Sequence, residues 1–281
     1  MRTVIAALVL AGLAAVPAHA AEGETCQGKP ATIVGGVSGA KGTEGDDVIV
    51  VRTDTTSLFE VEALGGQDTI CIEGPAPVDH GPEDIVSFVD GGEGVDRLEV
   101  TASAEDDDLE VYDVEQVDIA LLGGDDRLVL PDSLILPSNV AGGTGQNRLT
   151  LSFPGRLVAD LNDELLVLDG VRSTLRAFQK VRASAYRAVL EGSAASEILQ
   201  GAGCRVEVRG GKGDDFLTAR AYKYGKGCHV RGADLSGQQG NDRLRGTTKN
   251  DRLVGGPGRD RANGKGGVDS CDAEMRKACE R

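Results

Sequence analysis

The sequence has no Trp, and its 281 residues include only five Phe, four Tyr and three His. A core made mostly of large aromatic side chains is therefore excluded, and small and branched residues must supply the buried surface. The motifs HExxH and GxSxG are absent, which excludes the usual signatures of zinc proteases and serine hydrolases. Beyond the N-terminal segment only His80 and His229 remain, so we assign no catalytic residue and expect no enzyme.

Long apolar runs are missing as well, except at the N-terminus. Arg2 precedes the apolar segment 4–16, and Pro17 precedes a small-x-small site, Ala18-His19-Ala20. The apolar segment is shorter than the roughly 20 residues that a membrane span needs. It predicts a cleaved signal peptide over residues 1–20 and a secreted protein without a membrane span.

The cysteines fit export, because their number is even and an oxidising compartment favours disulfides. Fifteen pairings of six cysteines are possible, and the sequence does not choose among them. The simplest hypothesis pairs neighbours: Cys26–Cys71, Cys204–Cys228 and Cys271–Cys279. No CxxC motif or Cys/His cluster is present, which argues against a zinc site.

The formal net charge is −15, so the chain lacks the basic footprint that phosphate binding requires. We expect no nucleic-acid partner, and cations are the natural partners of such a chain. The sequence is also rich in glycine, with 40 residues. This composition suits a stacked repeat, in which each unit buries a small area against the next.

A nine-residue repeat is plainest near the C-terminus. From Gly237 the chain reads GQQGNDRLR, GTTKNDRLV, GGPGRDRAN and GKGGVDSCD, with an acid at each sixth place. The same frame extends back to Gly192 and covers nine units up to Asp272, including GSAASEILQ with Glu197 and GGKGDDFLT with Asp215. Upstream copies are sparser: GTEGDDVIV, GGEGVDRLE, ALGGQDTIC and LLGGDDRLV place an Asp sixth, whereas GGTGQNRLT places Asn147 there.

Each unit predicts a turn of six residues followed by a strand of three. The eighth residue points inward because side chains alternate along a strand. If two units form one coil, residues eighteen apart stack about 4.8 Å from each other. Asp251 would then lie over Asp269, and Asp242 over Asp260, on opposite edges. Stacked carboxylates repel, and Ca²⁺ relieves this because it binds 6–8 oxygen ligands from carboxylates and carbonyls.

GGEGVDRLE and GGKGDDFLT resemble the nonapeptide GGxGxDxUx of RTX, or hemolysin-type, calcium-binding repeats. The resemblance implies an all-β fold, a right-handed parallel β-roll or solenoid, with Ca²⁺ in its turns. The metal ligands that it implies are Asp47, Asp68, Asp96, Asp126, Asp215, Asp242, Asp251, Asp260 and Asp269. With its signal peptide and cysteines, the chain is most similar to exported repeat proteins of actinobacteria.

The frame also contains weaker units. Val206, Tyr224 and Ala233 replace the acid, which argues against sites there, and Glu197 is a marginal ligand over Asp215. Pro257 and Arg259 share one turn and are expected to weaken it.

Residues 98–189 contain short alternating segments at intervals of about 10–20 residues, and we favour a continuing β-solenoid whose turns are held by side chains. A short helix over 175–181 is the alternative. The acidic run 102–108 is interpreted as a solvated loop rather than a cation site. The predicted organisation is a signal peptide (1–20), a degenerate calcium-repeat solenoid (21–150), a segment without calcium motifs (151–191), a regular β-roll (192–272) and a C-terminal disulfide tail (273–281).

These features predict a secreted calcium-binding protein in which Ca²⁺ drives folding and stabilises the roll, with a structural or surface-associated role. One alternative is a calcium-dependent polysaccharide lyase, for which Arg172, Arg176, Lys180 and Arg182 form the nearest basic cluster. Another is an adhesion or carbohydrate-binding module, which the absence of Trp disfavours. The sequence identifies no cell-surface or polysaccharide partner.

Overall fold

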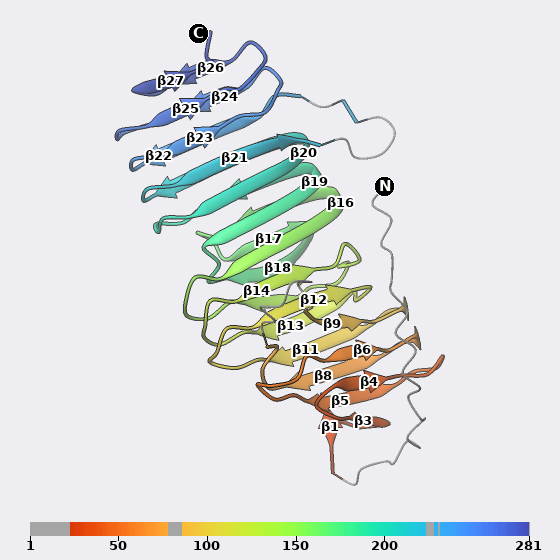
Figure 1. Ribbon diagram of the computed structural model, residues 1–281. Helices are drawn as coiled ribbons and strands as arrows, with labels where there is room; N and C mark the ends of the chain where they lie inside the picture. Colours follow the sequence, from red (N-terminus) through yellow and green to blue (C-terminus); the bar gives the residue numbers. More distant parts are fainter. Residues whose placement is uncertain (1–22, 78–85, 223–227, 230, 281) are drawn as a thin grey trace.

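The protein is a long stack of β-coils (Figure 1). Its structure, a computed structural model, describes residues 23–77, 86–222, 228–229 and 231–280. Across these residues the chain forms strands and no helix, and most strand pairs are parallel, so the predicted all-β roll is confirmed. The predicted signal peptide, His80 and Tyr224 lie outside the described residues.

The coils present two faces, here named face A and face B, joined at edge turns. Face A contains β4 (Gly39–Lys41), β6 (Glu60–Glu62), β9 (Ser87–Asp90), β12 (Asp108–Tyr112), β14 (Arg127–Leu130), β21 (Phe216–Ala221), β23 (Arg243–Arg245), β25 (Arg261–Asn263) and β27 (Met275–Lys277). Face B contains β3 (Ile33–Gly35), β5 (Val48–Arg52), β8 (Thr69–Glu73), β11 (Arg97–Thr101), β13 (Gln116–Ala120), β15 (Asn139–Ala141), β17 (Leu165–Leu168), β18 (Val171–Arg176), β22 (Asp234–Gln239), β24 (Arg252–Val254) and β26 (Ser270–Asp272). Three long strands continue from face A onto face B: β16 (Arg148–Asp160), β19 (Lys180–Glu191) and β20 (Ile198–Lys212).

Two short strand pairs lie outside the faces. The hairpin of β1 (Thr25–Cys26) and β2 (Lys29–Pro30) packs on the outer side of β5 and β8. Strands β7 (Gly65–Gly66) and β10 (Glu93–Gly94) pair in parallel at an edge turn.

The core is a set of aliphatic columns, because eighth-place side chains point inward on every strand. Leu199, Leu217 and Leu244 are consecutive partners in one column and are almost fully buried. On face B, Val208, Leu235 and Leu253 form the matching column. Each such side chain contributes roughly 1.5–3 kcal/mol by burial, which explains how the roll is stable with so few aromatic residues.

The coil of two nonads is confirmed over most of the C-terminal region but is wrong at one coil. Asp242 and Asp260, and likewise Asp251 and Asp269, are eighteen residues apart and stacked. Asp215, however, stacks on Asp242, which is 27 residues away. One additional nonad lies between β21 and β22, and Cys204–Cys228 ties this segment to β20. The nine-residue frame survives in the sequence because the insertion is itself nine residues long.

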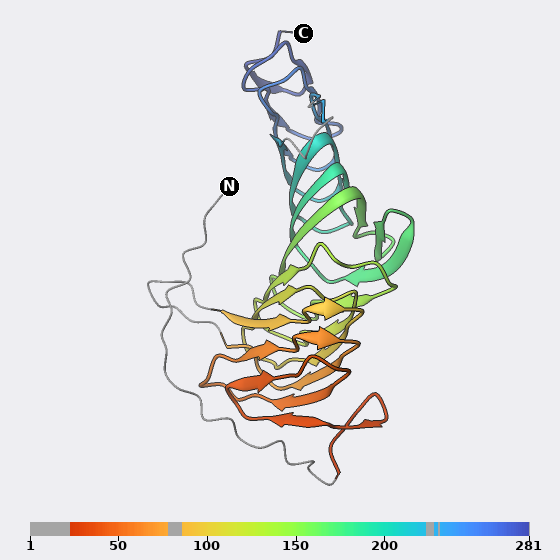
Figure 2. The same ribbon diagram turned by 90° about the vertical axis from the view of Figure 1, so that its right-hand side faces the viewer.

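The region between the two groups of repeats continues the solenoid, as predicted. Its distinguishing element is the antiparallel hairpin β17–β18, which is inserted on face B between β15 and the second half of β16. Figure 2 shows this green segment standing out from the side of the stack. A helix over 175–181 is not formed, since β18 ends at Arg176 and β19 begins at Lys180. Arg172 and Arg176 consequently lie on a different face from Lys180 and Arg182.

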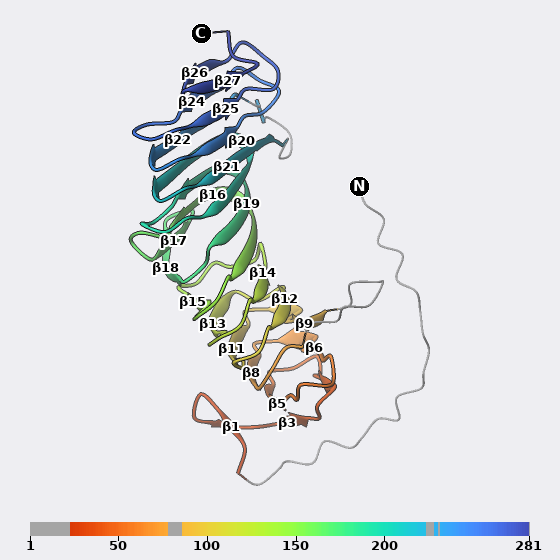
Figure 3. The same cartoon turned by 60° about the vertical axis from the view of Figure 1, so that its left-hand side comes forward.

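All three neighbouring cysteine pairs form disulfides, which confirms the simplest pairing. Cys26–Cys71 fixes the β1–β2 hairpin to β8, and Cys271–Cys279 closes the last coil. These two disulfides lie near opposite ends of the stack, where the terminal coils have a neighbour on one side only (Figure 3). Within the described part of the chain, no helix is long and apolar enough to cross a membrane.

Loss of the C-terminal disulfide should loosen the last coil selectively. Cys279→Ser opens a closure of eight residues and leaves Cys271 in its buried position. We expect a loss of about 2–3 kcal/mol and faster hydrogen exchange in β26 and β27 than in β16 and β19. The matched control is the pair Cys204→Ser/Cys228→Ser, which should accelerate exchange beside β20 instead. Unchanged exchange in β26 and β27 would show that this disulfide does not cap the roll.

Candidate metal centre

The sixth-place residues form hydrogen-bonded ladders along both edges of the roll. In each rung, the backbone N–H of one sixth-place residue donates to a side-chain oxygen of the sixth-place residue in the next coil. The Asp242 N–H donates to Asp260 Oδ1 at 2.8 Å, and the Asp251 N–H donates to Asp269 Oδ1 at 2.8 Å. Asp47, Asp68 and Asp96 repeat the pattern at the other end of the chain. One carboxylate oxygen of each acid therefore supports the backbone of its neighbour.

The second carboxylate oxygen is without a partner in most of these turns. Among the described residues, seven sixth-place Asp have a buried Oδ2 with no hydrogen bond: Asp68, Asp96, Asp126, Asp215, Asp242, Asp260 and Asp269. Glu197 Oε2 is in the same state. A buried acceptor without a partner costs about 1–3 kcal/mol, and more when it is charged. Such a regular series of unpaired acceptors indicates that a positively charged partner belongs beside them.

In several turns the free carboxylate oxygen faces a backbone carbonyl oxygen of a neighbouring segment, as it does for Asp96, Asp215 and Asp269. A Cβ placed on Gly264 would lie 2.1 Å from Asp269 Oδ2 and 2.3 Å from the carbonyl oxygen of Ala278. A Cβ on Gly210 would lie 2.3 Å from Asp215 Oδ2 and 2.6 Å from the carbonyl oxygen of Gly237. In these two turns the first place is glycine because a carboxylate and a carbonyl occupy the space of a side chain.

The turn of Asn147 provides an internal comparison. Its Oδ1 accepts the N–H of Asp126, as an Asp would, whereas its Nδ2 donates to the carbonyl oxygen of Ala177 at 3.1 Å. The Nδ2 donor of Asn147 therefore stands where an Asp has its Oδ2, and it bonds to the carbonyl oxygen that would otherwise face a second acceptor. Asp turns lack this donor, so a proton or a cation must take its place.

Four turns satisfy the acid differently, with a hydroxyl at the second place. The Thr43 N–H and Oγ1 donate to Asp47 Oδ2 at 2.7 and 2.8 Å. Asp251 receives the N–H of Thr247 on Oδ2 and its hydroxyl on Oδ1. Ser103 donates to Asp107 Oδ2 in the same way, and Ser193 donates to Glu197 Oε1. These hydroxyl-held turns leave no oxygen of their Asp unpaired.

Backbone conformation separates the two kinds of turn. In the turns with a free Oδ2, the second residue has a left-handed φ, even where it is Leu64 (φ 79°), Gln238 (φ 74°) or Lys265 (φ 72°). This conformation is uncommon outside glycine. The glycine at the fourth place, such as Gly240, is left-handed too. The hydroxyl-held turns have a positive φ at neither place. The left-handed turns therefore form one structural class, whatever residue stands second.

Burial raises the pKa of most of the free carboxylates. It is the largest cause that raises the pKa of Asp96 to about 6, and of Asp126 and Asp215 to about 7. Neighbouring acids on the ladder add to the effect, as Asp68 does for Asp96. The pKa values of Asp68, Asp242 and Asp260 are raised by burial as well. A cation bound at these turns would compete with a proton.

All nine predicted ligands lie on the ladders, and seven of them have the free oxygen. Whether each binds an ion stays a prediction, and Asp47 and Asp251 differ because their Thr residues already donate to them. Sequence reasoning missed Asp107, which is a sixth-place residue buried within the acidic run 102–108. A nonad that begins at Ala102 places Asp107 sixth, so applying the repeat there would have identified it. It also missed the residues that receive the last N–H of a ladder: Glu115, Gln179, Glu274 and Glu280.

The donor set fits Ca²⁺, which accepts carboxylate and carbonyl oxygens with flexible geometry. Among the described residues, no three His, Cys, Asp or Glu side chains converge into a metal-binding group. An ion would therefore be held by the free Oδ2 atoms together with backbone carbonyls of the glycine turns. Magnesium fits less well because it requires near-ideal octahedral geometry and keeps its waters.

Comparison with known families agrees with this chemistry. The model of the RTX calcium-binding nonapeptide repeat, in four copies, matches residues 236–271. A search of curated proteins finds no match to the chain. The matched segment holds the free carboxylates of Asp242, Asp260 and Asp269 and the hydroxyl-held turn of Asp251. Residues 236–271 are therefore RTX calcium-binding nonapeptide repeats, and Ca²⁺ is the ion that such repeats bind.

Proposed function

We propose that the protein is a secreted structural component whose β-roll is completed by Ca²⁺ at the left-handed turns. The observation that carries this proposal is the series of buried carboxylate oxygens, several of them facing carbonyl oxygens, that have no hydrogen-bond donor among the described residues. Bound Ca²⁺ would supply the missing positive charge. It would also join successive coils, since the facing oxygens belong to neighbouring coils.

The main ligands in this proposal are the seven Asp with a free Oδ2, and Glu197 is a weaker one. Asp47 and Asp251 contribute less, because Thr43 and Thr247 already hold their carboxylates. Upstream of residue 150, the turns of Asp68, Asp96 and Asp126 have the same left-handed second residue and free Oδ2 as the turns of Asp242, Asp260 and Asp269. We therefore extend calcium binding to Asp68, Asp96 and Asp126. The residues between 151 and 191 hold their turns without ions.

Secretion is part of the proposal. Three disulfides suit an oxidising compartment. Unpaired buried carboxylates would leave the chain poorly folded wherever Ca²⁺ is scarce, so folding would be completed after export. No residue is assigned a catalytic role, and the structural function needs none.

Calcium should stabilise the folded protein strongly. A ligand that binds only the folded state adds about 2.7 kcal/mol per site at a concentration of 100 Kd. We expect the melting temperature and the β-sheet circular dichroism signal to rise when millimolar Ca²⁺ replaces excess chelator. Magnesium at the same concentration is the control and should have a much smaller effect. The same melting curve in Ca²⁺ and in chelator would refute the proposal.

Exchanging Asp and Asn at the sixth place should remove the need for Ca²⁺ at one turn and create it at another. Asp260→Asn supplies the amide donor that Asn147 has, so the variant should bind less Ca²⁺ and melt at a higher temperature in chelator. Asn147→Asp should do the reverse, with higher calcium stoichiometry by calorimetry and a lower melting temperature in chelator.

Asp251→Asn is the matched control for Asp260→Asn. Its carboxylate accepts hydrogen bonds from Thr247, so the amide can replace it only with the loss of one of them. We expect destabilisation of about 1 kcal/mol with little change in calcium stoichiometry. If both substitutions lower the stoichiometry equally, the distinction between the two kinds of turn is wrong.

Without Ca²⁺, stability should rise as the pH falls from about 7 toward 4. The folded-state pKa values of Asp96, Asp126 and Asp215 lie above those of the unfolded chain, so the folded state binds more protons in this window. Exposed carboxylates with a lowered pKa, such as Glu274, oppose this only weakly because solvent screens them. Protons also displace Ca²⁺, so the stabilisation by Ca²⁺ should shrink in the same window. Melting temperatures at pH 5 and 7.5, with and without chelator, test both trends. A melting temperature in chelator that falls with acidification would contradict the assignment.

A further inference from the structure

The outer surface of face A carries two columns of side chains, from the seventh and ninth places of its nonads. In the seventh-place column, consecutive strand partners are Arg148, Lys180, Ile198, Phe216, Arg243 and Arg261. In the ninth-place column they are Thr150, Arg182, Gln200, Thr218, Arg245 and Asn263. Neither column contains an acid over this stretch, although the whole chain has a net charge of −15. We define the basic face as Arg148, Lys180, Arg182, Arg243, Arg245 and Arg261.

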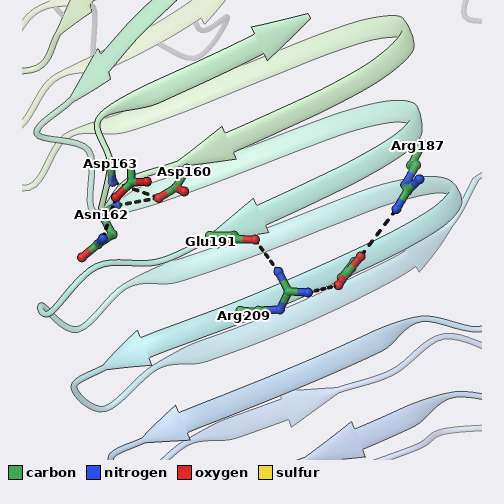
Figure 4. Close-up of polar contacts among 7 residues, drawn as sticks. Asp160, Asn162, Asp163, Arg187, Glu191 and Arg209 are labelled. Atoms are coloured by element: carbon green, nitrogen blue, oxygen red, sulfur yellow. Dashed lines mark hydrogen bonds and ion pairs between the residues drawn. The ribbon is translucent and has the colours of Figure 1, made fainter. Parts of the chain in front are cut away.

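The cations of the basic face form no ion pairs with any described residue, in contrast to several arginines on face B. Within the described part of the chain, none of the six forms an ion pair, whereas Arg209 on face B contacts both Glu191 and Glu207 (Figure 4). Arg187 lies 3.9 Å from Glu207, and Arg252 lies 3.2 Å from Asp234. Arg187, Arg209 and Arg252 on face B thus have acidic partners, whereas the six cations of the basic face have none in the described ranges and are available to a partner molecule.

Two exposed apolar side chains interrupt the seventh-place column at its centre. Ile198 is 43% exposed and Phe216 is 37% exposed, and they are direct cross-strand partners. Phe216 also stacks beside Arg243 in the next coil. An exposed aromatic ring among cations suits a ligand that has both apolar faces and acidic groups.

A groove runs alongside this column, between the basic face and the adjoining ladder edge. It has a volume of about 510 Å³ and is lined by Lys180, Ile198, Phe216, Arg243 and Arg261 on the side of the strands. The opposite side comprises edge residues, among them Gln179, Asp214, Arg259 and the ladder acids Glu197, Asp215 and Asp242. The groove crosses successive coils, so it follows the long axis of the stack. A ligand lying in it would be extended and would meet cations at more than one coil.

We propose that the basic face binds an acidic polysaccharide along the axis of the roll. Strands repeat about every 4.8 Å, so the columns offer cations in a regular series to a polymer that carries carboxylates along its length. Arg243 and Arg261 bind carboxylates in the groove, and Phe216 packs against the apolar face of a sugar ring. None of the six cations forms an ion pair with a ladder acid, but Glu197, Asp215 and Asp242 line the same groove. Ca²⁺ bound at these acids would neutralise that side of the groove, and to this extent the proposal rests on the proposed function.

The surface favours a sugar polymer over two other partners. A nucleic acid offers several bases for stacking, and the groove presents a single exposed aromatic ring to receive them. A second copy of this chain could oppose the basic face with the acidic end of face A. There, however, Asp108 and Glu110 already bind Arg127, and Glu62 already binds Lys41. The charged side chains of face A that have no described ion-pair partner are thus mainly positive, which suits an acidic polymer.

The test measures binding of a defined oligogalacturonate to the full protein by calorimetry at fixed free Ca²⁺, with a neutral malto-oligosaccharide as the control probe. We expect saturable binding of oligogalacturonate that weakens with added NaCl, because salt screens the interaction. The double variant Arg243→Gln/Arg261→Gln should lose about tenfold or more in affinity, since it removes charge-assisted hydrogen bonds. Its calcium stoichiometry should not change, which shows that the roll is intact.

The matched control, Arg209→Gln/Arg252→Gln, makes the same charge change on face B and should alter affinity by no more than about twofold. Equal losses in the two double variants would overturn the proposal, since only overall charge would then matter. Equal affinity for single-stranded DNA of the same charge would reject an acidic sugar as the partner. A salt-sensitive dimer in sedimentation, with no oligogalacturonate binding, would assign the face to a second copy of the chain.

Discussion

The opposition of two oxygen acceptors at each turn is the constraint on which the rest of the structure depends. Stacking of the coils directs one backbone N–H onto Oδ1 of the next sixth-place acid, and this leaves Oδ2 opposite a carbonyl oxygen. The chain resolves the opposition in three ways. Thr43, Ser103 and Thr247 donate a hydroxyl and an N–H, and Asn147 replaces the acid by an amide. The remaining described turns leave Oδ2 without a donor, and these are the turns to which the proposed function assigns Ca²⁺.

The ends of the ladders follow from the same constraint. A sixth-place N–H in the final coil has no acid in a next coil to receive it. Glu274 and Glu280 fill this role for Asp260 and Asp269, at 2.6 and 2.7 Å. Cys271–Cys279 joins the segment that carries these two residues to the last core position. The C-terminal tail therefore works as a cap that completes both the hydrogen bonds and the apolar column.

Much of this could be predicted from the sequence, because a strict period fixes which residues stack. The inward leucines and the sixth-place acids follow from it, whereas the disulfides were predicted only as the simplest pairing of neighbouring cysteines. Other features have no periodic signal. Leu64 and Gln238 adopt a left-handed φ because the turn imposes it, and Asp107 was hidden in an acidic run that begins without glycine. The hairpin β17–β18 is an insertion whose alternating residues resemble any other strand. The additional nonad between β21 and β22 preserves the nine-residue period, so the sequence pattern gives no sign of it.

That additional nonad has a consequence for the surface. Consecutive nonads alternate between faces, so a regular coil would pair Phe216 with Asp234, eighteen residues on. With three nonads in this coil, Phe216 pairs with Arg243 instead, and Asp234 goes to face B, where it binds Arg252. If the additional nonad formed a regular half-coil instead of lying outside the stack, Arg243 and Arg261 would lie across the roll from Lys180 and Arg182. Because one nonad is left out of the stack beside Cys204–Cys228, the unpaired cations stay on one face while the sixth-place ladders continue on both edges.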